Sequence, residues 1–294
     1  MSNLYICNTS TDTISKINLM DFKEEGQIPL RLRSQNKIGP HGICIYEDKL
    51  LTANSFGNSL SIISIDEGEE IENYFIGMNC NDVQVFEHNA YIVCGELNNI
   101  IVFNLMMKKI IEEIPCGSYP HSIYINKYNA LAVVANMHSD SITIFDCLNR
   151  DNLQQLSVSE YPTKAIFSED GQYIFVCESK LGLKSCGSLR IIDIDSLKTV
   201  AKIKLGNSPV DICTGQNYCY VSNFGDGTIS IIDINKLKVI RKIRVGGMPR
   251  GIVANGNHVY VGDNYNNLLV KVDIKKENKE VISIGGEPTG MTLI

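Results

Sequence analysis

Residues Tyr220–Asp233 read YVSNFGDGTISIID. Residues Tyr260–Asp273 repeat the pattern as YVGDNYNNLLVKVD, and Tyr5–Asn18 carries an earlier copy, YICNTSTDTISKIN. In these copies two short runs rich in β-branched and aromatic residues flank a polar turn, which favours two antiparallel strands. The chain therefore repeats one small unit of β-structure many times.

A second motif sets the period of the repeat. It has the form Gly-x-x-Pro-x-x-apolar, and Cys80 takes the place of the proline in one copy, GMNCNDV. The prolines of the other copies are Pro40, Pro120, Pro162, Pro209, Pro249 and Pro288. Successive markers lie 40, 40, 42, 47, 40 and 39 residues apart. Four strands in each unit of roughly 40 residues is the signature of a propeller blade.

The two ends of the chain are expected to close the ring. The chain opens at Leu4–Asn8 with a second-strand motif, and Glu287–Ile294 (EPTGMTLI) is a first strand with nothing after it. Joined, the fragments make one composite blade. The sequence thus predicts an all-β fold: a seven-bladed β-propeller with four antiparallel strands per blade, closed by pairing of the C-terminal strand with the N-terminal blade. We expect residues 1–294 to form this one domain, in which each blade buries its faces against its neighbours.

The units resemble the YVTN family of β-propeller repeats. YVSN, YVGD, VVAN and YICN stand where that family has Tyr-Val-Thr-Asn, and the resemblance covers essentially the whole chain. It implies a propeller but no single function, because propellers host many unrelated activities. Since proteins of this family are often exported, the resemblance also implies a cell-surface or envelope location.

Composition points to a different location. The chain has a net charge of −6, so neither nucleic acid nor an anionic membrane is an expected partner. The residues after Met1 lack the basic and apolar regions of a secretory signal, and no apolar run approaches the roughly 18 residues of a membrane helix. The ten cysteines form no CxxC pair. We expect a cytoplasmic monomer with reduced thiols and no membrane insertion.

Strand directions predict which residues meet. If each first strand runs down the ring axis from its proline and the second returns, three positions gather on one face, which we call the top face. The position after the proline (Pro+1) holds His41, Asn81, His121, Thr163, Val210, Arg250 and Thr289. The next position (Pro+2) holds Gly42, Asp82, Ser122, Lys164, Asp211, Gly251 and Gly290. The position that ends the second strand (Asn-type) holds Asn8, Asn54, Gly95, Asn136, Glu178, Asn223 and Asp263.

The three positions differ in how much they vary. The Asn-type position is nearly uniform, as expected of an amide that hydrogen-bonds nearby backbone in a turn. The Pro+1 and Pro+2 positions vary in size and charge, as would a ring around an asymmetric ligand, or a merely solvated surface. Our ligand-binding candidates are His41, Asp82, His121, Lys164, Glu178, Asp211 and Arg250. The loop Glu178–Ser188 is longer than its counterparts and is expected to overhang the top face, either as a binding loop or as a tolerated insertion.

More specific chemistry has little support. His41, His121 and His138 fall on the top face, but the first two come from blades separated by a whole blade and no HxH or HxxxH spacing occurs, so we expect neither a metal site nor a cofactor. The sequence GDG at Gly225–Gly227 is a turn rather than a phosphate loop. Cys7, Cys94 and Cys177 are expected to fill one small buried position, while Cys116 and Cys186 have no such explanation.

Two functions remain open. The preferred hypothesis is a non-catalytic propeller that binds a protein partner or a small ligand at the top face. The alternative is a lactonase-like hydrolase or lyase that uses His41, His121 and neighbouring acids. Titratable groups within hydrogen-bond reach around one pocket would favour catalysis, and charges more than about 6 Å apart would favour binding.

Overall fold

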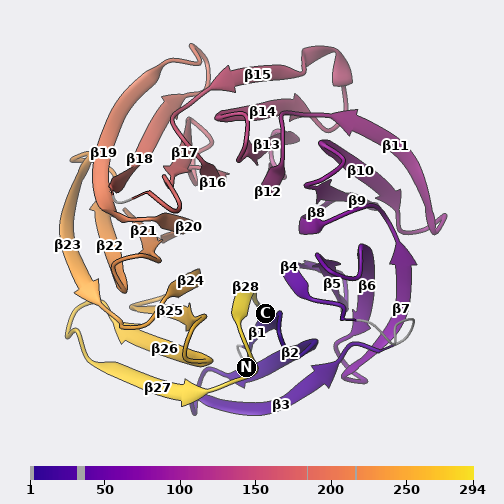
Figure 1. Ribbon diagram of the computed structural model, residues 1–294, viewed down its shortest axis with the longest axis horizontal. Coiled ribbons are helices and arrows are strands. Elements are labelled where there is room, and N and C mark those ends of the chain that lie inside the picture. Colours follow the sequence, from indigo (N-terminus) through magenta and orange to yellow (C-terminus); the bar gives the residue numbers. More distant parts are fainter. Residues whose placement is uncertain (1–2, 32–36, 184, 216) are drawn as a thin grey trace.

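A ring of seven four-stranded antiparallel sheets, blades A to G, makes up the computed structural model, which describes residues 3–31, 37–183, 185–215 and 217–294 (Figure 1). In blade A the order from the axis outward is β28 (Pro288–Leu293), β1 (Asn3–Asn8), β2 (Thr13–Asn18) and β3 (Lys23–Pro29). Blade B holds β4 (Pro40–Tyr46), β5 (Lys49–Asn54), β6 (Ser59–Ser64) and β7 (Glu69–Phe75). Blade C holds β8 (Cys80–Phe86), β9 (Asn89–Cys94), β10 (Asn99–Asn104) and β11 (Lys109–Pro115).

The remaining blades follow the same order. Blade D holds β12 (Pro120–Asn126), β13 (Leu131–Asn136), β14 (Ser141–Asp146) and β15 (Gln154–Ser157), with the 3-10 helix η1 (Arg150–Asn152) before β15. Blade E holds β16 (Pro162–Phe167), β17 (Tyr173–Glu178), β18 (Cys186–Asp193) and β19 (Thr199–Asn207). Blade F holds β20 (Pro209–Gly215), β21 (Tyr218–Asn223), β22 (Thr228–Asp233) and β23 (Lys238–Arg244). Blade G holds β24 (Pro249–Asn255), β25 (His258–Asp263), β26 (Leu268–Asp273) and β27 (Lys279–Ser283).

The predicted markers are the first residues of the seven inner strands, from Pro40 in β4 to Pro288 in β28. Proline suits the first position of a strand because it has no N–H to give to a ladder. Cys80 begins β8 at the equivalent place, as its spacing predicted. The predicted fold class is therefore confirmed down to the residue that starts each blade.

The predicted closure is confirmed as well. Strand β28 pairs antiparallel with β1, with Leu293 opposite Leu4. The pairing continues beyond the strands, because Asn3 and Ile294 exchange two backbone hydrogen bonds of 2.9 Å. The segments that complete blade A thus come from opposite ends of the sequence (Figure 1).

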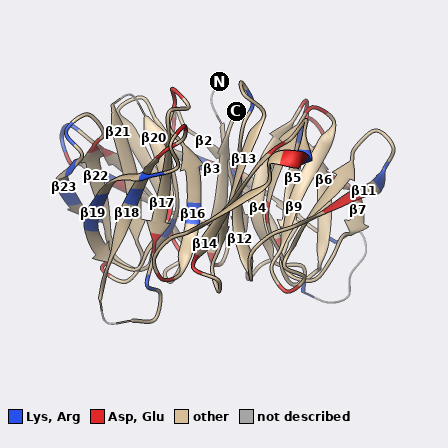
Figure 2. Ribbon diagram, turned by 90° about the horizontal axis from the view of Figure 1, so that it is seen from above, with Lys and Arg blue, Asp and Glu red and all other residues tan. Residues whose placement is uncertain are grey.

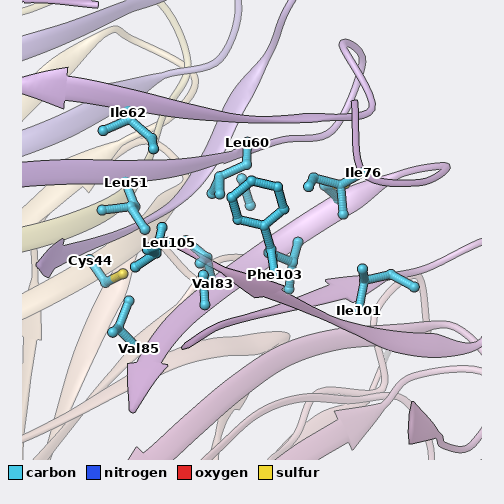
Figure 3. Packing of buried hydrophobic residues seen from close by; sticks show 14 of the residues in the cluster. Cys44, Leu51, Leu60, Ile62, Ile76, Val83, Val85, Ile101, Phe103 and Leu105 are labelled. Atoms are coloured by element: carbon cyan, nitrogen blue, oxygen red, sulfur yellow. The ribbon is translucent and has the colours of Figure 1, made fainter. Parts of the chain in front are cut away.

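The hydrophobic core is divided among the contacts between blades. In the described residues the buried apolar side chains form seven clusters, and each cluster joins two adjacent blades. Between blades B and C, for example, Leu51 and Leu60 meet Val83, Ile101 and Phe103, all of them nearly inaccessible to solvent (Figure 3). A single blade could not bury these faces alone, which is why the repeat must close into a ring.

The outermost strands are the exposed edges of the sheets. In blades E and F they are rich in lysine and arginine, with TVAKIKLGN in β19 and KVIRKIR in β23 (Figure 2). Charged side chains on an edge strand discourage pairing with another chain. Among the residues that the structure describes, none belongs to a helix long and apolar enough to cross a membrane.

Candidate functional site

The inner strands bring the Pro+1 and Pro+2 residues of all seven blades together around the axis. These fourteen residues line one narrow passage whose cavity is only about 50 Å³: His41, Gly42, Asn81, Asp82, His121, Ser122, Thr163, Lys164, Val210, Asp211, Arg250, Gly251, Thr289 and Gly290. Six of the seven ligand-binding candidates are among them. The seventh, Glu178, lies elsewhere.

The passage has two unlike sides. At Pro+2, blades G, A and B carry Gly251, Gly290 and Gly42, and an added Cβ at these positions would collide with the backbone of the next blade. Blades C to F instead carry the polar side chains Asp82, Ser122, Lys164 and Asp211. Glycine lets three inner strands approach closely, so the polar groups gather on the opposite side of the axis.

Most Pro+1 side chains link neighbouring blades. Each donates a hydrogen bond to a backbone carbonyl of the following blade, over 2.7–3.4 Å. The donor and acceptor pairs are His41 with Asn81, Asn81 with Pro120, His121 with Thr163, Thr163 with Pro209, and Thr289 with Pro40. A carbonyl accepts from any donor of suitable length. This explains why His, Asn and Thr alternate at one structural position.

Arg250 fixes the protonation of His41. The Nδ1 atom of His41 lies 2.7 Å from the carbonyl oxygen of Asn81, which can only accept, so Nδ1 carries the proton. Its Nε2 atom lies 2.8 Å from Nη2 of Arg250, which can only donate. His41 is therefore neutral, and both of its nitrogens are engaged. Burial, the charge of Arg250 and the nearby His121 lower the pKa of His41 well below its ordinary value.

His121 differs from His41 in one nitrogen. Its Nδ1–H also donates to a carbonyl, that of Thr163, at 2.9 Å, but among the described residues Nε2 has no hydrogen-bond partner. Burial and the charge of Arg250 lower the pKa of His121 to about 4. The ring is therefore neutral at pH 7, with Nε2 as an open acceptor. The two imidazole rings meet edge to face, with centroids 5.5 Å apart, although blade C lies between their blades.

A charged layer lies directly below. Asp82 accepts hydrogen bonds from the amides of Val83 and Ile123 and forms an ion pair of 3.0 Å with Lys164. Asp211 accepts from the two equivalent amides of its own and the next blade, at 2.9 and 3.2 Å. Burial raises the pKa of Asp211. Burial opposes the charge of Lys164, but Asp82 and Asp211 outweigh it and hold its pKa above the ordinary value.

Above the passage the channel widens into a cavity of about 260 Å³, which we call the mouth. Four side chains from the top-face loops line it together with His41, His121, Val210 and Arg250. They are Tyr119, Met137, Leu181 and Phe224. The mouth thus combines apolar walls with one guanidinium group. The repeat did not single out these four residues, although Tyr119 directly precedes Pro120, and Met137 and Phe224 directly follow the Asn-type residues Asn136 and Asn223. Leu181 shows that the long loop reaches the mouth, as expected; Lys184 of that loop lies outside the described residues.

Glu178 is buried inside blade E. Its carboxylate forms ion pairs with Arg190 and Lys202 and accepts from Ser188 and from the amide of Ser159. Burial opposes its ionisation, but Lys202, Ser188 and Arg190 outweigh burial and lower the pKa of Glu178 to about 2. Because both oxygens are engaged, we leave Glu178 out of the candidate site.

The Asn-type position has a structural role in four blades. There the amide nitrogen donates to two hydroxyl groups on the third strand, as Asn136 does to Ser141 and Thr143. The other three are Asn8, Asn54 and Asn223. Glu178 occupies the same place with Ser188 and Arg190 as its partners. The position therefore ties the second strand of a blade to the third.

In blade C our alignment of this position was wrong by one residue. The strand register places Cys94, not Gly95, at the Asn-type position, opposite Asn99, and Val93 in the small buried slot. Cys94 faces Cys80 across the first two strands, with their sulfur atoms 3.7 Å apart. Cys7 and Cys177 are buried, as expected of that small position, whereas Cys116 is partly buried and Cys186 is exposed.

Within the described ranges, no group of three or more His, Cys, Asp and Glu side chains is arranged to hold a metal ion. His138 lies apart from the channel, stacked on Tyr119 with a centroid distance of 4.3 Å. The proximity that we took to favour catalysis does occur, because His41, Arg250, Lys164 and Asp82 lie within hydrogen-bond reach in pairs. These contacts form two separate pairs, His41 with Arg250 and Lys164 with Asp82, and His41 and Asp82 are also bound to backbone groups.

Comparisons with known proteins agree with the fold. No family model and no curated protein sequence matches the chain. Among solved structures, a functionally unknown protein from Desulfotomaculum acetoxidans has a TM-score of 0.81 and 16% identity, over 99% of this chain and 98% of its own. Hydrazine synthase of Kuenenia stuttgartiensis has a TM-score of 0.75 and 19% identity, over 84% and 81%. Dihydro-heme d1 dehydrogenase NirN, in complex with DHE, has a TM-score of 0.68 and 12% identity, over 99% and 74%. At these identities the likeness shows the propeller fold alone.

Proposed function

We propose that the protein binds a small ligand in the mouth of the axial channel. The observation that supports this is the guanidinium of Arg250: among the described residues no carboxylate lies within ion-pair distance of it, and its one hydrogen bond goes to the neutral His41. A cation that is partly withdrawn from water without a counter-ion is costly. Concave, mainly apolar cavities with a few fixed polar groups are typical of ligand sites.

We favour a small ligand over a protein partner because of where the charge lies. Arg250 sits at the base of the mouth beside His41 and His121, below the level of the apolar loop residues. A small molecule can enter and contact all of these groups together. A protein would have to insert one side chain to do the same.

Val210→Trp tests this proposal. Val210 lines the mouth and makes none of the links between blades, so an indole there should fill the cavity without removing a charge or a hydrogen bond. We would screen a panel of organic acids, nucleotides and sugars for an increase in Tm. Ligands that stabilise the parent should not stabilise Val210→Trp. Gln84→Ala should respond like the parent, because Gln84 lines a separate cavity of about 300 Å³ on the other side of the charged layer from the mouth. Ligands that stabilise Val210→Trp equally would contradict binding in the mouth.

Catalysis is the second candidate, supported by the proximity of His121 to Arg250 around His41. His121 could accept a proton at Nε2 while the guanidinium stabilises a developing oxyanion. A base with a pKa of about 4 is weak at neutral pH, however, which is why we rank this function second. Proton release from small lactones that disappears in His121→Thr would support it.

We also propose that the blades are YVTN-type repeats. The supporting residue is the asparagine of YVSN, Asn223, which ends β21 and binds the hydroxyls of Thr228 and Ser230.

A further inference from the structure

The ligand class follows from which atoms of the mouth can donate and which can accept. This step rests on the proposed function, because it identifies what the same cavity would hold. Arg250 supplies only donors. Its guanidinium has five N–H groups, and among the described residues one of them is used, on His41.

Among the described residues, carboxylates act on Arg250 only from beyond ion-pair distance: burial lowers its pKa and outweighs Asp211 and Glu287, which favour its charged form. Asp82 is bound to Lys164 and to two amides, and Asp211 to two amides. Because two positive and two negative side chains line the passage, it is balanced overall, and its negative charges lie on the far side of Arg250 from the mouth. A single negative charge in the mouth would pair with Arg250, whereas a second would be repelled by the layer below.

His121 supplies the complementary atom. Its Nδ1 proton is committed to the carbonyl of Thr163, so Nε2 can accept a hydrogen bond but cannot donate one. A carboxylate oxygen would be repelled there, and a hydroxyl group would fit. A ligand ammonium group is disfavoured, because it would lie beside the guanidinium of Arg250, which borders both the mouth and His41.

The two groups lie close enough for one small molecule. Arg250 Nη2 is 2.8 Å from Nε2 of His41, and the ring of His121 is 5.5 Å from the ring of His41. Both groups are thus direct neighbours of the His41 ring, and a small molecule that carries an acceptor and a donor a few bonds apart can reach both. The walls formed by Tyr119, Met137, Leu181 and Phe224 would then cover an apolar remainder, within a cavity of about 260 Å³.

We propose that the mouth binds a hydroxy monocarboxylic acid with an apolar body, its carboxylate on Arg250 and its hydroxyl donating to Nε2 of His121. Neither histidine acts as an acid or base in this arrangement. His41 is a positioning residue, since it holds the guanidinium through the tautomer that Asn81 imposes.

Isothermal titration calorimetry with four related acids tests this assignment. Racemic phenyllactate carries the proposed carboxylate and hydroxyl, phenylpropionate lacks the hydroxyl, phenylalanine replaces it with ammonium, and phenylpyruvate replaces it with a carbonyl. Phenyllactate should bind most tightly, and each of the others should bind about tenfold more weakly: phenylpropionate and phenylpyruvate cannot donate a hydrogen bond to Nε2 of His121, and phenylalanine brings a positive charge beside Arg250.

Three variants test which side chain binds the carboxylate of the ligand and which binds its hydroxyl. Arg250→Gln keeps a donor for His41 but loses the charge, so phenyllactate and phenylpropionate should both weaken by at least about tenfold. His121→Thr keeps a link of the kind that Thr163 and Thr289 make, and should remove the advantage of phenyllactate over phenylpropionate while leaving phenylpropionate nearly unchanged. Lys238→Gln removes a charge on the outer strand β23 and should change nothing.

The possible failures are distinct. Equal affinity for phenyllactate and phenylpropionate in the parent, or phenyllactate binding that survives Arg250→Gln, would overturn the hydroxy acid assignment. If none of the four acids binds while other members of the panel bind the parent and not Val210→Trp, the assignment is wrong and ligand binding in the mouth stands. If no panel member distinguishes the parent from Val210→Trp, the proposed function fails with it.

Discussion

Two sets of polar side chains repeat around the ring, and the kind of partner that each set binds determines how much its residue type varies. In four blades the Asn-type side chain lies within the blade and binds specific hydroxyls on its third strand, as Asn136 binds Ser141 and Thr143. The Pro+1 side chains lie between blades and bind backbone carbonyls, as His121 binds that of Thr163. A residue whose partner is a side chain can change only when the partner changes too. A residue whose partner is a carbonyl needs only to remain a donor.

Blade E offers the strongest test of the first half of this comparison. Glu178→Ala should lower the free energy of unfolding by about 3–5 kcal/mol, because it leaves Arg190 half-buried without its counter-ion. Urea denaturation would measure it. The double variant Glu178→Asn with Arg190→Ser installs the pattern of the other blades and should recover part of the loss. If the double variant is less stable than Glu178→Ala, the two positions do not form the exchangeable pair that we infer.

The same carboxylate should make stability depend on pH. Its pKa is about 2 in the folded protein against an ordinary value of 4.5, so the folded state is stabilised fully above that ordinary value. The contribution is lost as the pH falls from about 4.5 towards about 2. Glu178→Gln should therefore show a shallower decline in stability than the parent over this range. Parallel curves would contradict the ion pairs described for Glu178.

Blade C tests whether partners must change together. Cys94→Asn places an amide opposite Asn99 and near the apolar Ile101, whose counterparts in blades A, B, D and F carry a hydroxyl, and should cost about 1–3 kcal/mol for the hydrogen bond that Ile101 cannot make. Adding Ile101→Ser should restore a partner, so the double variant should lose less than the sum of the single variants. Additive losses in denaturation experiments would show that the two positions are independent.

One substitution made at both positions compares them directly. Asn136→Thr leaves a single hydroxyl where an amide bound two partners, and should cost about 1–2 kcal/mol. Asn81→Thr converts a link between blades into the kind already made by Thr163 and Thr289, and should stay within about 0.5 kcal/mol of the parent. Thermal unfolding of the two variants side by side would decide the comparison, which fails if their costs are equal.

The smallest expected effect is on the pKa values of the two histidines in the passage. In NMR titration His121 should titrate near pH 4, and His41 well below its ordinary range, because burial and Arg250 disfavour their charged forms. Arg250→Met should raise both pKa values. Since the unfolded histidines bind protons at higher pH than the folded ones, this pair lowers stability as the pH falls below about 6.5. An ordinary pKa for His121 would contradict the effect of burial and of Arg250 on this ring.

The sequence predicted the backbone well because the same strand pattern occurs seven times. Proline marks the start of each inner strand for a local reason, and Cys80 could be placed by spacing alone. The error at Gly95 arose because Cys94 looks like Cys7 and Cys177, which fill a neighbouring position; a slip of one residue along a strand reverses the side that a residue faces. The contact between His41 and Arg250 was not foreseen, because it depends on how closely the inner strands approach the axis. The three Pro+2 glycines set that approach, and a pattern within one blade contains no information about it.

Those glycines have one more consequence. They come from the consecutive blades G, A and B, while the side chains that fill the same level come from blades C to F. A ring of seven similar blades thereby encloses a space without rotational symmetry. The apolar walls, the guanidinium of Arg250 and Nε2 of His121 each occupy a different, fixed place in it. Because these are different contacts at fixed places, the two enantiomers of one chiral acid cannot satisfy all of them equally.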